Sequence, residues 1–153
     1  SSGKRAKALW ASVGAGIVVL SLYGAVLLTD TGPIAWAAYT PDRLERAFKE
    51  HKTVAMIFTA EWCLNCKALE QGVWGNPELV RLVSEPSVLP VKVDLTGSNP
   101  EGRKRLQAAG SLTIPLLLVY TPDGRPIFRS DFYTADQVMG AIRASLAASP
   151  SKP

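Results

Sequence analysis

The chain has 153 residues, 47% of them hydrophobic, which is enough for one domain with a core and an appendage. Its 17 Lys and Arg exceed the 13 Asp and Glu by four, and three of these cations, Lys4, Arg5 and Lys7, lie together near the start. The remainder is nearly balanced and shows no basic stripe, so the composition argues against a nucleic-acid-binding surface.

An uncharged stretch covers residues 9–28, after a start that we expect to be a tag remnant (SSG) and a basic cytoplasmic flank over residues 1–8. In a helix, about 20 residues rising about 1.5 Å each span about 30 Å, the thickness of a bilayer's hydrocarbon core. The sequence therefore predicts a transmembrane helix over residues 9–29. A signal peptide ending near Ala35-Trp36-Ala37 is an alternative, although its apolar region is usually only about 7–15 residues long. A buried core helix would show a polar face, and this stretch has none.

The basic flank also predicts the orientation of the chain. By the positive-inside rule, residues 1–8 lie in the cytoplasm and the domain lies on the outer side of the membrane, where disulfides persist. Residues 30–39 are expected to be a linker, since Gly32-Pro33 ends any helix. Within it, Trp36 and Tyr39 fit either the membrane interface or packing against the domain.

Residues 40–148 alternate helical and strand patterns, which predicts an α/β domain with a mixed central sheet flanked by helices. Thr40 and Thr134 are the predicted N-caps of its first and last helices. Gly75-Asn76-Pro77 is predicted to break or kink the second helix, and residues 149–153 are expected to form a flexible tail. In chain order, the predicted elements are helix 40–51, strand 53–60, helix 63–85, strand 87–95, helix 99–110, the hairpin strands 115–121 and 126–132, and helix 134–148.

The two cysteines of the chain, Cys63 and Cys66, lie just after the first predicted strand. The free N–H groups and positive dipole end of the following helix favour a thiolate at Cys63. Cys66 is one turn later, close enough to resolve a mixed disulfide. A structural zinc site would need four ligands, and the two cysteines and the distant His51 cannot supply them alone. A structural disulfide gains most from closing a long loop, and this loop is very short. Redox exchange is therefore the favoured hypothesis.

The segment "AEWCLNCK" resembles the WCxxCK active site of the thioredoxin superfamily, and the β-α-β-α-β-β-α order matches that fold. From Tyr39 to about Leu146, the chain is most similar to the C-terminal periplasmic domain of the DsbD family of thiol:disulfide interchange proteins. The shared features are "AEWCLNCKALE", "VDLTGSN", "TIPLLLVYTPDG" and a membrane helix directly before the domain.

This resemblance implies roles for individual residues. Cys63 would be the attacking thiolate and Cys66 the resolving thiol, with Trp62 shielding the thiols and forming part of the docking surface. The Ile114-Pro115 bond would be cis, next to the disulfide. Alternatively, Pro115 has only the structural role of opening a strand.

Related domains usually carry a buried Asp six residues before the first cysteine, and this chain has Ile57 there. Proton transfer would then fall to Glu70, Glu61 or water. Glu70 fits two interpretations, an exposed acid near Lys67 or a carboxylate that tunes the dithiol or accepts its proton. Lys67 is otherwise expected to face solvent.

The function that the resemblance implies is a membrane-tethered thiol-disulfide oxidoreductase in the bacterial inner membrane, with its domain in the periplasm. A membrane-embedded dithiol would donate electrons, and periplasmic thioredoxin-like or other disulfide proteins would accept them. No cofactor is needed, because the cysteine pair carries the electrons. Two alternatives remain: an independent membrane-anchored reductase for cytochrome c maturation, and a non-catalytic docking module with a structural disulfide.

Overall fold

The computed structural model describes residues 32–148, together with Gly3 and Gly16. Apart from these two glycines, the predicted basic flank, transmembrane helix and tail lie outside the described residues. Among the residues that are described, no helix is long and apolar enough to cross a membrane. The domain described below lies within residues 32–148.

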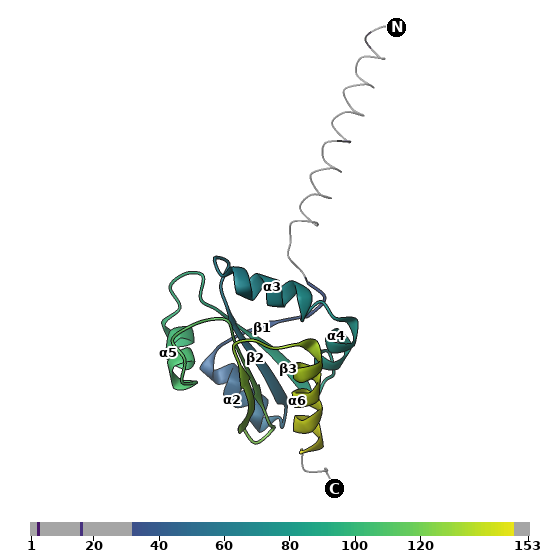
Figure 1. The fold of residues 1–153 in the computed structure, drawn as a ribbon, viewed down its shortest axis with the longest axis vertical. Coiled ribbons are helices and arrows are strands. Elements are labelled where there is room, and N and C mark those ends of the chain that lie inside the picture. Colours follow the sequence, from purple (N-terminus) through teal and green to yellow (C-terminus); the bar gives the residue numbers. More distant parts are fainter. Residues whose placement is uncertain (1–2, 4–15, 17–31, 149–153) are drawn as a thin grey trace. The chain divides into compact units, whose positions relative to one another are not determined.

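A mixed five-stranded sheet, ordered β1-β3-β2-β4-β5, forms the centre of this domain (Figure 1). β2 pairs in parallel with β3 and antiparallel with β4, and β4 forms the predicted hairpin with β5. The predicted mixed sheet is therefore confirmed. The strands are β1 (Ala37–Ala38), β2 (Thr53–Thr59), β3 (Val88–Asp94), β4 (Leu116–Tyr120) and β5 (Pro126–Ser130).

Polar caps fix where the helices begin. Thr40 accepts a hydrogen bond from the Arg43 N–H, and Thr134 forms a capping box with Gln137, so both predicted caps are confirmed. The predicted break before Pro77 separates α3 from α4. The helices are α2 (Pro41–Lys49), α3 (Leu64–Gly72), α4 (Pro77–Val83), α5 (Pro100–Ala108) and α6 (Ala135–Ala147).

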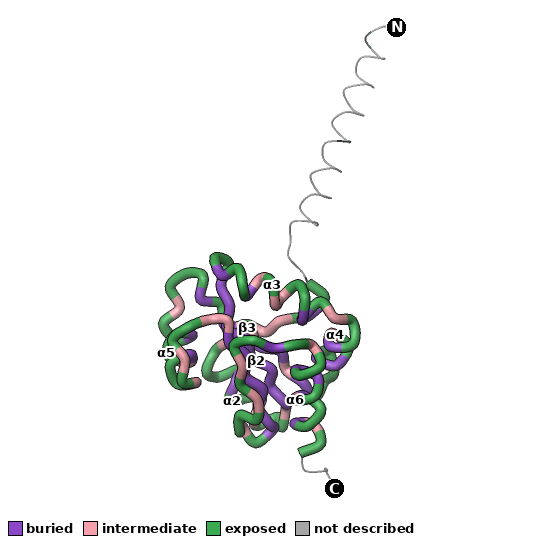
Figure 2. Tube along the Cα trace, in the orientation of Figure 1, coloured by how far each residue is buried: buried purple, intermediate pink, exposed green. Residues whose placement is uncertain are grey.

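β2 is buried along its whole length (Figure 2). It separates two hydrophobic cores. Because side chains alternate along a strand, Ala55 and Ile57 face one core and Val54, Met56 and Phe58 face the other. The first core is covered by residues of α4 and α6, and the second by residues of α2 and α5. Both cysteines belong to the second core, where β2 has ended and α3 begins.

The predicted linker is wrong in its described part. Ala37 and Ala38 form β1, which pairs in parallel with β3, and Ile34 is buried in the first core. The Trp36 ring packs edge-on against Trp74, with centroids 4.9 Å apart, so packing against the domain is the correct interpretation for Trp36. A strand of two residues shows no alternation of side chains, so the sequence pattern could not reveal it.

Candidate functional site

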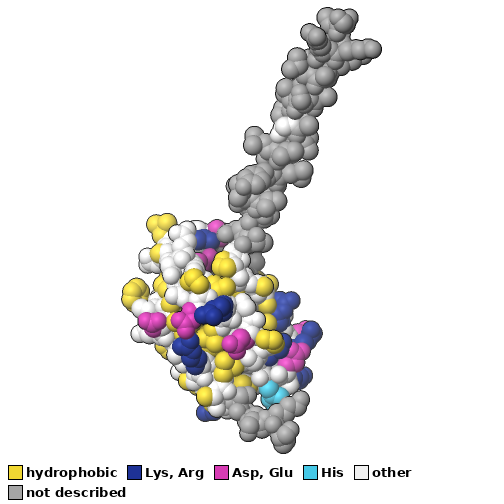
Figure 3. Space-filling model, turned by 90° about the vertical axis from the view of Figure 1, so that its right-hand side faces the viewer, with side chains coloured by type: hydrophobic (Ala, Val, Ile, Leu, Met, Phe, Trp, Pro, Cys, Tyr) yellow, Lys and Arg dark blue, Asp and Glu magenta, His cyan; other side chains and the backbone are white. Residues whose placement is uncertain are grey.

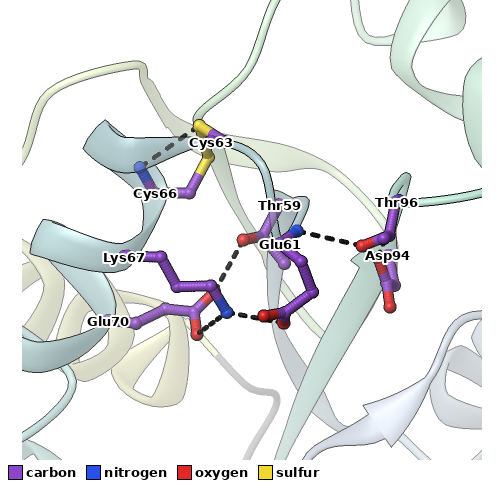
Figure 4. The surroundings of a disulfide bond; sticks show 8 residues. All are labelled: Thr59, Glu61, Cys63, Cys66, Lys67, Glu70, Asp94 and Thr96. Carbon is purple, nitrogen blue, oxygen red and sulfur yellow. Dashed lines mark hydrogen bonds and ion pairs between the residues drawn. A yellow bond between two sulfur atoms is a disulfide. The ribbon is translucent and has the colours of Figure 1, made fainter.

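The Cys63–Cys66 disulfide lies where β2 passes into α3. Cys63 is the N-cap of α3, and its sulfur accepts a hydrogen bond of 3.2 Å from the Cys66 N–H (Figure 4). The two sulfurs are bonded, and the Cα atoms are 5.2 Å apart. The predicted position of Cys63, just past a strand at the start of a helix, is confirmed.

This position matters for sulfur chemistry. The first N–H groups of a helix have no partner within the helix and lie at its positive end. A Cys63 thiolate would accept the same N–H that the disulfide sulfur accepts, and such contacts favour a thiolate over a thiol. Cys63 is 7% exposed and Cys66 2% exposed, so a partner can approach Cys63 more readily.

Glu70 lies in a partly buried cluster of charges below the disulfide (Figure 4). One carboxylate oxygen accepts a hydrogen bond of 2.6 Å from the Thr59 hydroxyl. The other oxygen lies 3.5 Å from the Lys92 ammonium and 3.7 Å from the Lys67 ammonium. With 17% of its side chain exposed, Glu70 is not the surface acid of the simpler interpretation. Within residues 32–148, the structure shows no hydrogen bond between Glu70 and either cysteine.

Lys67 and Glu61 stabilise the loop that leads to Cys63. Their ammonium and carboxylate are 2.6 Å apart, and the Glu61 N–H donates to the Thr96 hydroxyl at 2.9 Å. The loop is thereby joined to α3 on one side and to the segment after β3 on the other. Lys67 is mostly covered, contrary to the expectation that it faces solvent.

Large apolar side chains project into solvent around the disulfide. Trp62, Leu64, Leu112 and Phe132 are each between 64% and 85% exposed. Trp62 and Leu112 line one hollow, Phe132 lines a second, and both hollows include Thr113 and Ile114. Such exposure is unusual for large apolar groups unless they bind a partner. Sequence analysis identified only Trp62, because isolated apolar residues in loops have no period.

The Ile114-Pro115 peptide bond is cis, as the resemblance implied. Ile114 is partly buried against the core that contains the cysteines, and Pro115 leads directly into β4. Both residues line the hollow beside Asn65, the second residue between the cysteines. The pair therefore lies beside the disulfide, although it is about 50 residues later in the chain.

Ile57, where related domains have an acid, is 2% exposed in the first core. Its neighbour across the ladder is Lys92 of β3, and paired residues in a sheet direct their side chains to the same face. Thr59, two residues later, shares this face. The position of the missing acid is therefore flanked by Lys92 and by the Thr59 hydroxyl that contacts Glu70.

Trp74 and Tyr133 form a buried pair behind Glu70 that the sequence analysis did not identify. The Trp74 indole N–H donates to the Tyr133 hydroxyl at 3.2 Å. Burial raises the pKa of Tyr133 to about 12; the Trp74 hydrogen bond opposes this effect, and the Glu70 charge adds to it. Tyr133 thus stays protonated, and uncharged, through the physiological pH range.

No metal centre is present in the part of the chain that the structure describes, because no three His, Cys, Asp or Glu side chains come together there as ligands. Charged groups on the face in Figure 3 are of both signs and are interspersed with hydrophobic side chains.

Comparisons with known proteins agree with this geometry. A family model described as Thioredoxin-like matches residues 35–122, more than half of the chain. The thiol:disulfide interchange protein DsbD of Neisseria meningitidis serogroup A is 27% identical over 103 residues, 66% of this chain and 16% of the relative. DsbD of Pseudomonas fluorescens is 30% identical over 81 residues, 53% of this chain and 14% of the relative. The chain thus spans about a sixth of the length of these relatives.

Solved structures show the same relationship. The oxidised C-terminal domain of Neisseria meningitidis DsbD matches with a TM-score of 0.59 and 26% identity, covering 72% of this chain and 99% of that domain. A thioredoxin from Thermus thermophilus, at 20% identity and a TM-score of 0.62 over 78% of this chain and 92% of its own, shares the fold. Together with the CxxC disulfide, these similarities support a thiol-disulfide oxidoreductase. The chain belongs to the thioredoxin-like family, and its domain is related to the C-terminal domain of DsbD.

Proposed function

We propose that the domain passes reducing equivalents from a membrane-embedded dithiol to periplasmic disulfide proteins through the Cys63–Cys66 pair. The observation that carries this proposal is a disulfide at a helix N-cap, surrounded by exposed apolar side chains. A disulfide that only stabilised the fold would not need such surroundings.

The reaction requires two exchange steps. The Cys63 thiolate attacks one sulfur of the partner's disulfide, forming a mixed disulfide and releasing the partner's other sulfur as a thiolate. Cys66, once deprotonated, attacks the Cys63 sulfur, releases the second partner thiolate and re-forms the Cys63–Cys66 disulfide. The partner gains two electrons and two protons, and the domain loses two electrons and two protons. The membrane dithiol then reduces the domain by the reverse sequence.

The proton of Cys66 needs an acceptor. Glu70 accepts a hydrogen bond from the Thr59 hydroxyl, which fixes its orientation, and Thr59 shares a face of β2 with Ile57. We assign the acceptor role to Glu70, acting through water. Glu61 is a weaker candidate, because its carboxylate is mostly exposed and is ion-paired with Lys67.

The exposed apolar side chains indicate that the partner is a protein. A small disulfide needs only access to Cys63, whereas Trp62, Leu64, Leu112 and Phe132 present an apolar surface around it. Aromatic and aliphatic side chains of this kind bind apolar patches of partner proteins. Similarity to the C-terminal domain of DsbD supports a periplasmic location and a membrane tether, as do the uncharged residues 9–28 and the basic residues before them.

Trapping the mixed disulfide tests this proposal. Reduced Cys66→Ser protein, mixed with native insulin as the disulfide substrate, should give a covalent adduct that persists because no resolving thiol remains. Addition of a reductant should remove this adduct. Cys63→Ser should give little adduct, since Cys66 is buried. Adduct with Cys63→Ser alone would reverse the two roles. Absence of adduct in both variants would refute the proposed exchange.

A further inference from the structure

Lys92 is a half-buried cation between the active-site helix and the start of the domain. It projects from β3, with 29% of its side chain exposed, and its ammonium is 3.5 Å from the Glu70 carboxylate. The same ammonium lies 5.5 Å from the centre of the Trp36 ring, which favours a cation over its face. Lys92 is thus held by groups from two elements, α3 and the segment before β1.

Two lysines face Glu70, but they are not equivalent. Lys67 lies closer to Glu61, at 2.6 Å, than to Glu70, at 3.7 Å. Its charge is therefore shared with an exposed carboxylate of the loop. In the described part of the chain, the ion pairs connect Lys92 to one carboxylate, that of Glu70. Lys92 therefore gives Glu70 a positive charge that the described ion pairs do not share with a second carboxylate.

The sheet register gives this pair its place in the site. Lys92 is the ladder partner of Ile57, and Thr59 on the same face donates to the other oxygen of Glu70. The carboxylate reaches this face from α3, while the cation comes from the strand beside Ile57. Tyr133 is a further titratable neighbour of Glu70, and burial raises its pKa to about 12, so that it stays neutral during exchange at neutral pH.

We infer that Lys92 is a positioning residue for the redox reaction: it compensates the charge of Glu70 and holds its carboxylate at Thr59, below the dithiol. This inference rests on the proposed function. An uncompensated carboxylate near the dithiol would oppose formation of the thiolate, because like charges repel. Lys92 offsets this repulsion, so that Glu70 can stay ionised near the dithiol and remains able to take up a proton.

The test is the rate at which a small alkylating reagent reacts with the reduced protein, measured from pH 5 to 9. Lys92→Gln should raise the pH midpoint of this rate by about half a unit, which is about a threefold lower rate below the midpoint. Lys92→Met should do the same, since it also removes the charge. Lys92→Arg should restore the wild-type profile, because it keeps the cation.

A double variant shows whether Lys92 acts through Glu70. If it does, Lys92→Gln combined with Glu70→Gln should have the profile of Glu70→Gln alone. The matched control is Lys52→Gln, which removes a lysine of similar exposure (31%) and its ion pair with Glu50 at the beginning of β2, away from the site. Its profile should equal that of the wild type.

Three results would overturn the inference: wild-type profiles in both neutral Lys92 variants, an Arg variant that shifts as far as the Gln variant, or additive shifts in the double variant. Failure of the proposed function looks different. In that case the reduced wild-type protein would not exchange with a protein disulfide at any pH, whereas refutation of the Lys92 role leaves that exchange intact.

Discussion

Restoring an acid at position 57 tests whether the side chain there lies in an apolar core without a partner for a carboxylate. Ile57 is 2% exposed in a core formed with Trp74, Leu117 and Val119. Its ladder partner Lys92 already contacts Glu70 and Trp36, so a new carboxylate would not find a free cation there. Ile57→Asp should therefore place an acid in an apolar environment without a ready partner.

The cost follows from burial. Losing a fully buried Ile costs about 1.5–3 kcal/mol, and burying a carboxyl group without a hydrogen bond adds about 1–3 kcal/mol. The protonated variant should therefore lose about 2.5–6 kcal/mol of unfolding free energy. Burial raises the pKa of the new carboxyl above its unfolded value of about 4. The folded state then keeps a proton that the unfolded chain releases, so the deficit grows as pH rises, by about 1.4 kcal/mol per pH unit until the raised pKa is passed.

Urea unfolding of the oxidised protein, at intervals from pH 4.5 to 7.5, measures this deficit. Ile57→Val is the control, with an expected loss of about 1 kcal/mol that does not vary with pH. Exchange near pH 7 should also be faster in Ile57→Asp, because a proton acceptor is restored. Parallel stability curves for the Asp and Val variants would refute the reasoning, since they would mean that the carboxyl is hydrated or paired.

Three further predictions concern other parts of the domain. The free energy of unfolding of the wild type, measured in urea, should fall by about 2 kcal/mol between pH 9.5 and 11.5, because the folded state retains the Tyr133 proton up to about pH 12. Tyr133→Phe should not show this fall. Equal falls in both proteins would contradict the burial of this group. Leu112→Ser should slow exchange with a protein disulfide about fivefold, about 1 kcal/mol, and leave exchange with a small disulfide unchanged. An equal effect on both substrates would mean that Leu112 does not bind the partner. Thr53→Val should cost about 1–2 kcal/mol on unfolding, since it leaves the buried Ser145 hydroxyl without its 2.7 Å partner; a neutral result would show that this hydrogen bond contributes no net stability.

Local signals in the sequence were sufficient for most of the fold. Thr40, Asn76 and Thr134 cap their helices through their own side chains, and this chemistry depends only on residues within one turn. The position of Cys63 followed from the end of a buried strand and the start of a helix, which are also local features. The cis bond before Pro115 came from the resemblance alone.

The parts that the sequence did not reveal depend on contacts between distant segments. β1 exists because β3 offers a free edge, which no pattern within residues 37–38 encodes. The neighbours of Glu70 come from two strands, with Thr59 on β2 and Lys92 on β3, so its partial burial could not be inferred from its place on the helix. Leu112 and Phe132 became notable only when the fold placed them near the disulfide.

The reduction potential of the Cys63–Cys66 pair tests the redox role most directly. It can be measured by equilibrating the protein with dithiothreitol or glutathione buffers and quantifying the free thiols by alkylation. A disulfide that exchanges electrons should have a potential between about −270 and −120 mV, the range of dithiol oxidoreductases. A potential below about −300 mV would mark a structural disulfide that resists reduction, and would contradict the function proposed for this domain.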